Sequence, residues 1–247
     1  GARNANKMRI FQKGFNFSQD GPGNRLVYHL QGCNLRCPWC SNPEGLTLSG
    51  GTECPVEALL EEVSRSALMF FDGGGVTLTG GEVTLQLDEV RQLLHGLHGQ
   101  GVNTCIETNG ISPRLPELFP ELDLLIMDIK HHDPETHRRV TGLPNTGTFR
   151  SIQAALAQGQ RLALRIPLIG GFNASMEDAR AFARLLTQLG VPGHASVELL
   201  AYHEYGKSKY EKLGMAYTMG ADAHVSRETA AEFGAILSAA GIELIHT

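Results

Sequence analysis

Short apolar runs alternate with amphipathic segments along most of this chain, and this alternation limits the fold more than any other feature. The runs cover residues 26–30, 76–79, 102–106, 122–129, 162–169 and 197–201. Runs of this length and composition are typical of strands buried in a parallel sheet. Strands that alternate with helices join through right-handed crossovers, so the sequence predicts an α/β fold.

The segments between the runs predict helices with one apolar face. Apolar residues recur there at i, i+3, i+4 and i+7. The sets are Val56, Leu59, Leu60 and Val63; Val90, Leu93, Leu94 and Leu97; and Ala179, Phe182, Ala183 and Leu186. Pro55 suits a first helical turn, and glycines 99, 190 and 241 stand where helices should end. A last helix is expected over residues 226–240.

Six strand and helix units fit either an open doubly wound sheet or a curved barrel. Polar residues follow the strand ends, at residues 33–40, 80–82, 107–110 and 128–130 and at His203. The active sites of barrels lie at the carboxyl ends of the strands, so this pattern favours a partial, laterally open (β/α)6 barrel. The length of 247 residues and 42% hydrophobic content suit a single domain over residues 8–247. Residues 1–7, ahead of Met8, are interpreted as an expression remnant.

Charge and hydropathy exclude several classes of protein. The formal net charge is -5, with no basic stripe, which argues against a nucleic-acid partner. No apolar stretch is long enough for a membrane span or a signal peptide. The five cysteines are an odd number, which suits a reducing compartment. We therefore expect a cytoplasmic protein without a membrane partner.

Three cysteines, Cys33, Cys37 and Cys40, lie within eight residues. Three thiolates at these intervals can hold a four-iron, four-sulfur cluster and leave one iron without a protein ligand. Zinc is the alternative, with His29 on a predicted strand as the fourth ligand. The spacing favours the iron–sulfur cluster, and zinc stays open as the alternative.

Glycines and charged residues gather at the other strand ends. Gly80 and Gly81 precede Glu82, and glycine lets a backbone approach a ligand closely, although a plain turn is the simpler interpretation. Asp128 and Lys130 end an apolar strand, where they suit a ligand or form an ion pair with each other. Arg165, inside another apolar strand, suits a carboxylate of the protein or of a ligand.

These motifs resemble the radical S-adenosylmethionine (SAM) superfamily, and among its members the glycyl-radical-enzyme activating enzymes, such as pyruvate formate-lyase activating enzyme. The matching segments run in order from about residue 15 to residue 214. They are residues 20–23, 31–33, 40–44, 73–82, 107–110, 128–130 and 202–207, together with Trp39 before the last cysteine of the trio.

The resemblance implies a radical SAM oxidoreductase. Cys33, Cys37 and Cys40 would bind one 4Fe-4S cluster whose open iron chelates SAM. Gly80, Gly81 and Glu82 would receive the methionine amino group of SAM. Lys130, Arg165 and His203 would reach its carboxylate and ribose. Reductive cleavage would yield a 5′-deoxyadenosyl radical that takes hydrogen from a glycine of a partner glycyl radical enzyme, under anaerobic conditions. Asp20, in the turn of residues 20–23, would hold the glycyl loop or simply form the turn.

The sequence departs from the resemblance in two places. Glu107 stands where pyruvate formate-lyase activating enzyme has Asp; by resemblance, Glu107, Thr108 and Asp128 would form a monovalent-cation site for Na⁺ or K⁺. The segment after residue 44 lacks the cysteine-rich, ferredoxin-like insert of many activating enzymes. One cluster is therefore expected, with flavodoxin or ferredoxin as external electron donor.

The remaining cysteines and a histidine group suggest structural roles. Cys105 is expected in the core and Cys54 at a helix entry, while His131, His132 and His137 are expected to be solvent-exposed. Two other functions stay open: a radical SAM enzyme acting on a small molecule or peptide, and a non-catalytic metal-binding module.

Overall fold

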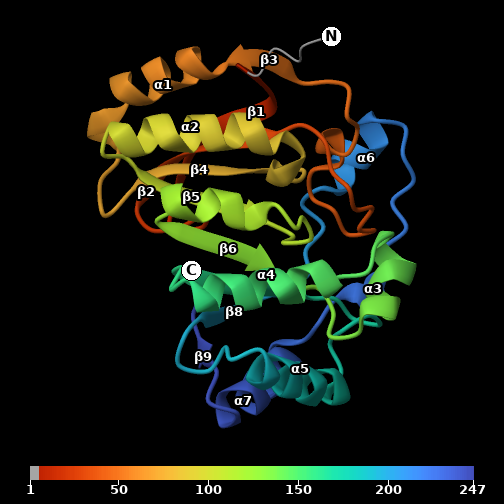
Figure 1. Cartoon of the computed structure of the whole chain (residues 1–247). Coiled ribbons are helices and arrows are strands. Elements are labelled where there is room, and N and C mark those ends of the chain that lie inside the picture. The colour runs from red at the N-terminus through yellow and green to blue at the C-terminus, as the bar shows by residue number, and fades with distance from the viewer. Residues whose placement is uncertain (1–5) are drawn as a thin grey trace. The chain divides into compact units, whose positions relative to one another are not determined.

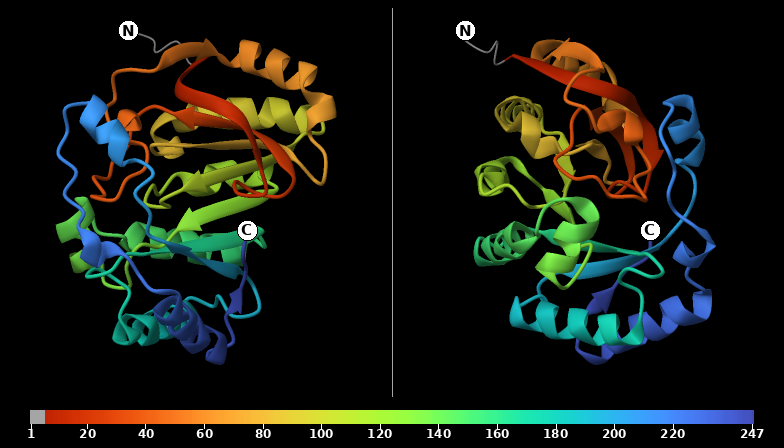
Figure 2. Two further views of the ribbon diagram at one scale, coloured as in Figure 1. Left: turned by 180° about the vertical axis from the view of Figure 1, so that it is seen from behind. Right: turned by 90° about the vertical axis from the view of Figure 1, so that its right-hand side faces the viewer.

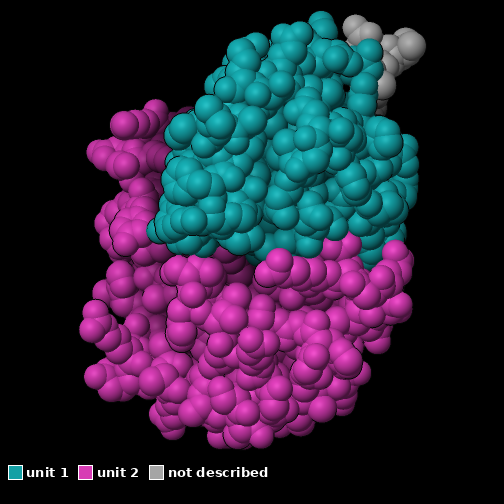
Figure 3. Space-filling view, turned by 90° about the vertical axis from the view of Figure 1, so that its left-hand side faces the viewer, with its two compact units in different colours: residues 1–34, 44–108, 112–126 teal, residues 35–43, 109–111, 127–247 magenta. Residues whose placement is uncertain are grey.

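A computed structural model describes residues 6–247 of the chain (Figure 1). The chain divides into two compact units, coloured separately in Figure 3. Unit 1 comprises residues up to 34, 44–108 and 112–126, and unit 2 comprises residues 35–43, 109–111 and 127–247. The cysteine motif therefore begins in unit 1 with Cys33 and continues in unit 2.

Unit 1 is built on a sheet with a parallel centre and an antiparallel edge. Its strands are β1 (Lys7–Phe17), β2 (Asn24–Leu30), β3 (Thr52–Pro55), β4 (Gly75–Gly80), β5 (Asn103–Thr108) and the first part of β6 (Leu124–Asp128). The strand order is β3-β1-β2-β4-β5-β6. β2 pairs in parallel with β4 and β4 with β5, whereas β1 runs antiparallel to both β2 and β3.

The helices of unit 1 cover this sheet with the apolar faces that the sequence predicts. They are α1 (Val56–Arg65), α2 (Leu87–Gly99) and the 3-10 segments η2 (Ala67–Met69), η3 (Val83–Gln86) and η4 (Leu115–Glu121). In α2 the predicted stripe of Val90, Leu93, Leu94 and Leu97 is fully buried. Burying side chains of this size stabilises the fold by about 1.5–3 kcal/mol each.

Unit 2 has a short parallel sheet in the order β7-β8-β9. Its strands are β7 (Leu162–Leu168), β8 (Ser196–Ala201) and β9 (Glu243–Leu244). Its helices are α3 (Pro134–Thr141), α4 (Thr146–Ala157), α5 (Met176–Gln188), α6 (Lys207–Lys212) and α7 (Arg227–Ala239). Two 3-10 segments accompany them: η5 (Ala221–Ala223), and η1 (Pro43–Gly45) at the boundary of the two units. Figure 2 shows α5 and α7 side by side. Phe182 of α5 and Phe233 of α7, both fully buried, lie 6.0 Å apart between ring centroids.

The six predicted strands and the predicted helical faces are confirmed. Each apolar run overlaps one of the strands β2 and β4 to β8, and the last helix, Arg227–Ala239, lies within the expected range. Cys105 is fully buried in β5, as expected. The sequence did not reveal β1, β3 or β9, because β1 is largely exposed over its second half and the other two are short.

The predicted domain boundaries stay predictions. Residues 1–5 of the supposed expression remnant lie outside the described residues, while Lys7 begins β1 and aligns with Pro55 of β3. In residues 6–247, no helix has the length and apolar character needed to cross a membrane.

Candidate functional site

The three cysteines of the motif are half-buried and lie outside any disulfide. In unit 1, Cys33 follows Gly32, and its N–H donates to the Leu46 carbonyl at 3.3 Å. In unit 2, the N–H of Cys40 donates to the Cys37 carbonyl at 3.1 Å, which closes a tight turn. Thiols that form no disulfide and that solvent can still reach suit an iron–sulfur cluster better than a role as buried core cysteines.

The glycine pair after β4 is fixed against the backbone that leads to Cys33. The N–H of Gly81 donates to Leu30 at 3.0 Å, and the N–H of Glu82 donates to Gly32 at 2.7 Å. A Cβ atom on Gly81 would lie 2.1 Å from the Gly32 carbonyl oxygen, so only glycine fits there. The plain-turn interpretation is thus insufficient, because close packing against Gly32 is what requires this glycine.

Glu82 carries a carboxylate that hydroxyl groups hold in place. Its residue is 1% exposed, and the Thr108 hydroxyl donates to its two oxygens at 2.7 and 2.8 Å. The Thr84 hydroxyl donates to Oε2 at 3.0 Å. Two motifs that are far apart in the sequence therefore meet at the carboxyl ends of β4 and β5. A buried carboxylate of this kind suits a cationic group such as an ammonium.

Glu107 and Asp20 also lie at ordered positions in unit 1. Glu107 accepts a hydrogen bond from the Thr79 hydroxyl at 2.7 Å. Asp20 accepts from the Asn16 side chain at 2.5 Å, and its backbone carbonyl accepts from the Thr77 hydroxyl at 2.6 Å. The Asp20 turn is thus held on both sides.

Arg25 is a structural residue of this turn that sequence reasoning missed. It is fully buried and donates to the Thr77 hydroxyl at 2.8 Å, the Pro22 carbonyl at 3.0 Å and the Asn103 side chain at 2.8 Å. Burial lowers the pKa of its guanidinium. The sequence signal that could have identified it is an arginine directly before the apolar run at residues 26–30. An arginine at such a position is buried with the strand, and its guanidinium then needs several hydrogen-bond acceptors.

In unit 2, the two predicted cationic residues are paired with carboxylates. Lys130 lies 3.1 Å from Asp128, and Arg165 lies 3.3 Å from Glu198. Arg165 and Glu198 are aligned neighbours on β7 and β8, and their side chains are 12% and 4% exposed. The ion-pair interpretation is therefore confirmed for both, although such a pair can still exchange partners with a ligand carboxylate. Glu198 had not been singled out in the sequence.

His203 is placed after β8, as the sequence predicts. Its ring stacks on Tyr205 with centroids 4.1 Å apart, and its Nδ1 accepts from the Tyr205 N–H at 3.3 Å. Partial burial of the ring lowers the pKa of the imidazole. The lowered pKa favours the neutral imidazole, which can both donate and accept a hydrogen bond.

The expectation of solvent exposure for the histidine group is wrong for two of its members. His131 is 4% exposed and His137 is 2% exposed. Both ring nitrogens of His131 are used: Nδ1 accepts from Asp133 N–H at 2.9 Å and Nε2 donates to the Phe172 carbonyl at 3.1 Å. The local helix signals did not show that Phe182 of α5 packs against the rings of His131 and His132.

His131, His132 and Asp178 are close enough to suggest a metal site. His132 Nε2 contacts Asp178 at 2.7 Å, and Asp178 also caps α5 together with Ser175. Hydrogen bonds already occupy both ring nitrogens of His131, so this residue has no nitrogen available to bind a metal. We therefore interpret the three residues as a structural hydrogen-bonded cluster.

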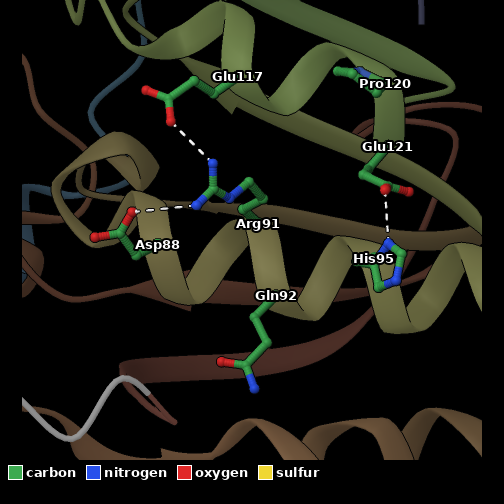
Figure 4. A pocket seen from close by; sticks show the side chains of 7 residues that line it. All are labelled: Asp88, Arg91, Gln92, His95, Glu117, Pro120 and Glu121. Atoms are coloured by element: carbon green, nitrogen blue, oxygen red, sulfur yellow. Dashed lines mark hydrogen bonds and ion pairs between the residues drawn. The ribbon is translucent and has the colours of Figure 1, made fainter.

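A groove of about 460 Å³ lies on the outer side of α2 and η4 in unit 1 (Figure 4). Its charged groups satisfy one another. Arg91 pairs with Glu117 at 3.0 Å and His95 pairs with Glu121 at 2.8 Å. The groove contains none of the predicted site residues.

Comparison with known proteins agrees with these observations. Residues 27–185 match the family model of the radical SAM superfamily. The chain is 36% identical to a pyruvate formate-lyase-activating enzyme of Clostridium pasteurianum, over 81% of this chain and 84% of the relative. It is 31% identical to the pyruvate formate-lyase 1-activating enzyme of Escherichia coli K12, over 90% and 92% of the two chains.

Solved structures show the same fold. A domain of a pyruvate-formate lyase-activating enzyme from Bacteroides vulgatus matches 70% of this chain and 98% of its own, with 25% identity and a TM-score of 0.57. A radical SAM methyltransferase from Sphaerobacter thermophilus matches 94% of this chain and 67% of its own, with 20% identity and a TM-score of 0.64. The expected partial barrel of the radical SAM type is thereby confirmed. The chain belongs to the radical SAM superfamily and, within it, to the glycyl-radical-enzyme activating enzymes.

Proposed function

We propose that this protein installs a glycyl radical in a partner enzyme at the expense of SAM. The observation that carries the proposal is the rigid link between the cysteine motif and the Gly80, Gly81 and Glu82 segment, whose backbone bonds directly to Gly32. Cys33, Cys37 and Cys40 would hold a 4Fe-4S cluster. Once bound, the cluster supplies the electron that splits SAM into methionine and a 5′-deoxyadenosyl radical, which takes hydrogen from the partner's glycine.

The protein's own groups bind and orient SAM. The carbonyls of the glycine pair and the Glu82 carboxylate would receive the ammonium group of its methionine part. Lys130, Arg165 and His203 would bind its carboxylate and ribose. Lys130 has three donors and is only 8% exposed, so a ligand carboxylate can share the ammonium group that Asp128 already contacts.

A monovalent cation beside SAM belongs to the same proposal. Glu107, Thr108 and Asp128 supply oxygen atoms, the ligand type that hard cations prefer. The Thr108 hydroxyl donates its proton to Glu82, and its oxygen would be the ligand atom for a cation. Replacing K⁺ and Na⁺ by tetramethylammonium should therefore weaken SAM binding, and Glu107→Asp should alter which cation is preferred.

The reaction needs two protein partners. Asp20, in its fixed turn, would hold the partner's glycyl loop, and flavodoxin or ferredoxin would deliver the electron. We place the reaction in an anaerobic cytoplasm, where thiols stay reduced and the glycyl radical survives. Pyruvate formate-lyase is the first partner to test, because the relatives named above are activating enzymes of that protein.

Anaerobic reconstitution tests the proposal. The parent protein should bind about four irons, show the broad visible absorbance of a 4Fe-4S cluster and form methionine and 5′-deoxyadenosine with dithionite. Cys37→Ala should lose all of these, while Cys54→Ala, a matched control in β3, should keep them. Retained SAM cleavage in Cys37→Ala would contradict the ligand assignment.

Electron paramagnetic resonance tests the protein substrate. Mixing the reduced enzyme, SAM and pyruvate formate-lyase should produce the doublet of a glycyl radical. Formation of 5′-deoxyadenosine without a doublet for any glycyl radical enzyme would favour the alternative of a small-molecule or peptide substrate. Absence of a cluster would favour the metal-binding module.

A further inference from the structure

The segment of residues 35–43 in unit 2, which carries Cys37 and Cys40, is held by two helices. At one end, the N–H of Arg36 donates to the Thr141 carbonyl, at the end of α3, at 2.7 Å. At the other end, the Tyr210 hydroxyl of α6 donates to the Cys40 carbonyl at 2.9 Å. The cysteine segment, α3 and α6 therefore form one continuous part of unit 2, which we call the cysteine face.

The contact between α6 and the cysteine segment is close. A Cβ atom on Gly206 would lie 2.8 Å from the Cα of Ser41, so the two backbones touch. The Lys209 ammonium donates to the Asn42 side chain at 3.0 Å. Contacts through backbone and hydrogen bonds keep α6 at a fixed position relative to Cys40.

The cysteine face is positively charged, in contrast to the whole chain. Arginines and lysines on its three elements form a group that we call the basic rim: Arg36, Arg138, Arg139, Lys207, Lys209 and Lys212. Glu135 and Glu211 are the acidic residues on these elements, and Asp133 and Glu204 flank α3 and α6. The face and its flanks thus carry six basic and four acidic residues, an excess of two positive charges, on a chain whose formal net charge is -5.

Exposed apolar groups accompany this charge. Tyr205 precedes α6 and is 83% exposed, while Leu213 and Met215 follow it at 48% and 40%. Lysines around aromatic and aliphatic side chains are typical of a surface that binds an acidic protein partner transiently, because charge steers the encounter and apolar contacts hold it.

The chemistry of the reaction says which acidic partner this is. Of the five cysteines, Cys54 lies in β3 and Cys105 is fully buried in β5, so only the three of the motif are suited to a cluster. Every electron for that cluster therefore comes from another molecule. The carrier must approach the cysteine ligands, and Cys37 and Cys40 belong to the basic face.

We propose that the cysteine face, with its basic rim, is the docking surface of an acidic one-electron carrier protein of the flavodoxin type. The inference rests on the proposed function. In the transfer, the flavin hydroquinone of the carrier loses one electron and the bound cluster gains it, and no atom moves between the proteins.

Charge reversal at the rim tests this surface. Arg139→Glu combined with Lys212→Glu changes one exposed residue on each helix. The matched control is Arg180→Glu with Arg184→Glu, which makes the same change in charge on exposed residues of α5. The assay measures 5′-deoxyadenosine formation against the concentration of flavodoxin hydroquinone at low salt.

The rim variant should need about tenfold more flavodoxin for half-maximal rate, since reversed charges at an interface rim mainly slow association. The control should stay within about twofold, and the difference should nearly vanish at about 1 M salt, where the Debye length is about 3 Å. Arg139→Gln with Lys212→Gln should give an intermediate effect. Equal flavodoxin requirements in rim variant and control would overturn the proposal.

Dithionite separates this inference from the proposed function. With dithionite as reductant, all variants should cleave SAM and form glycyl radical at the parent rate, because the small reductant needs no docking surface. A loss of glycyl radical in the rim variant under dithionite would overturn the proposal and assign the face to the glycyl radical enzyme. If the parent itself fails to cleave SAM with dithionite, the proposed function fails first.

Discussion

Replacing Thr108 by Val tests whether the hydroxyl pair around Glu82 organises the candidate site. Valine keeps the shape of threonine but removes the hydroxyl that lies 2.7 and 2.8 Å from the two carboxylate oxygens. Because Glu82 is 1% exposed, water does not replace this donor. A hydrogen bond to a charged group contributes about 1.5–3 kcal/mol, so we expect Thr108→Val to lower the free energy of unfolding by about 2 kcal/mol.

The matched control is Thr148→Val. The Thr148 hydroxyl is equally buried, but it donates at 2.7 Å to a neutral backbone carbonyl, that of Asn109. Losing that bond should cost about 1 kcal/mol. Anaerobic urea unfolding, followed by circular dichroism, measures both losses in proteins reconstituted in the same way.

Rescue and ligand binding complete this test. Thr108→Ser restores the hydroxyl and should recover most of the lost stability, apart from the missing methyl group. SAM affinity should fall in Thr108→Val and recover in Thr108→Ser, because Glu82 is the proposed partner of the SAM ammonium group. A Thr108→Val loss no larger than that of Thr148→Val would refute the argument that the Glu82 carboxylate depends on this donor.

Three further outcomes follow from single contacts. Burial lowers the pKa of His137 to about 4, below the unfolded value of 6.5. The free energy of unfolding should therefore be highest above pH 6.5 and should fall by up to about 3 kcal/mol as the pH drops toward 4, because only the unfolded state binds the proton there. His137→Gln should flatten the plot of unfolding free energy against pH in this window, and an unchanged plot would exclude His137 as the source. Gly81→Ala would place its Cβ 2.1 Å from the Gly32 carbonyl oxygen, so iron content after reconstitution should fall sharply, and full iron content would mean that this turn relaxes freely. Glu198→Gln leaves the Arg165 guanidinium buried without its counter-charge. The free energy of unfolding, measured by urea titration, should therefore fall by about 3 kcal/mol. A change below about 1 kcal/mol would show that the ion pair contributes little to stability.

The parallel core and the cysteine motif were predictable because each depends on residues that are close in sequence. The apolar stripe of α2 and the runs of β4 and β5 show their burial through local periodicity alone. The strand β1 was not predictable, because its pairing with β2 and β3 comes from backbone hydrogen bonds that leave little trace in its largely polar second half.

The histidine cluster shows the limit of local patterns most clearly. His131 and His137 lie in a polar stretch next to a helix start, and such a stretch is usually exposed. Only the packing of Phe172 and Phe182 against the His131 ring reveals its burial. Burial of this kind depends on residues about 40 to 50 positions away, which no periodicity records.

The sequence by itself determined the class of chemistry. The spacing of the cysteines indicates a cluster, the glycines indicate a close approach of the backbone, and the order of strands and helices predicts a parallel sheet. Each of these properties can be read from residues that are close in the sequence. The tertiary structure alone decided how these pieces are used. It joined Glu82 to Thr108, Arg165 to Glu198 and Cys40 to α6, since hydrogen bonds and ion pairs between distant segments arise only when the backbone brings their partners together.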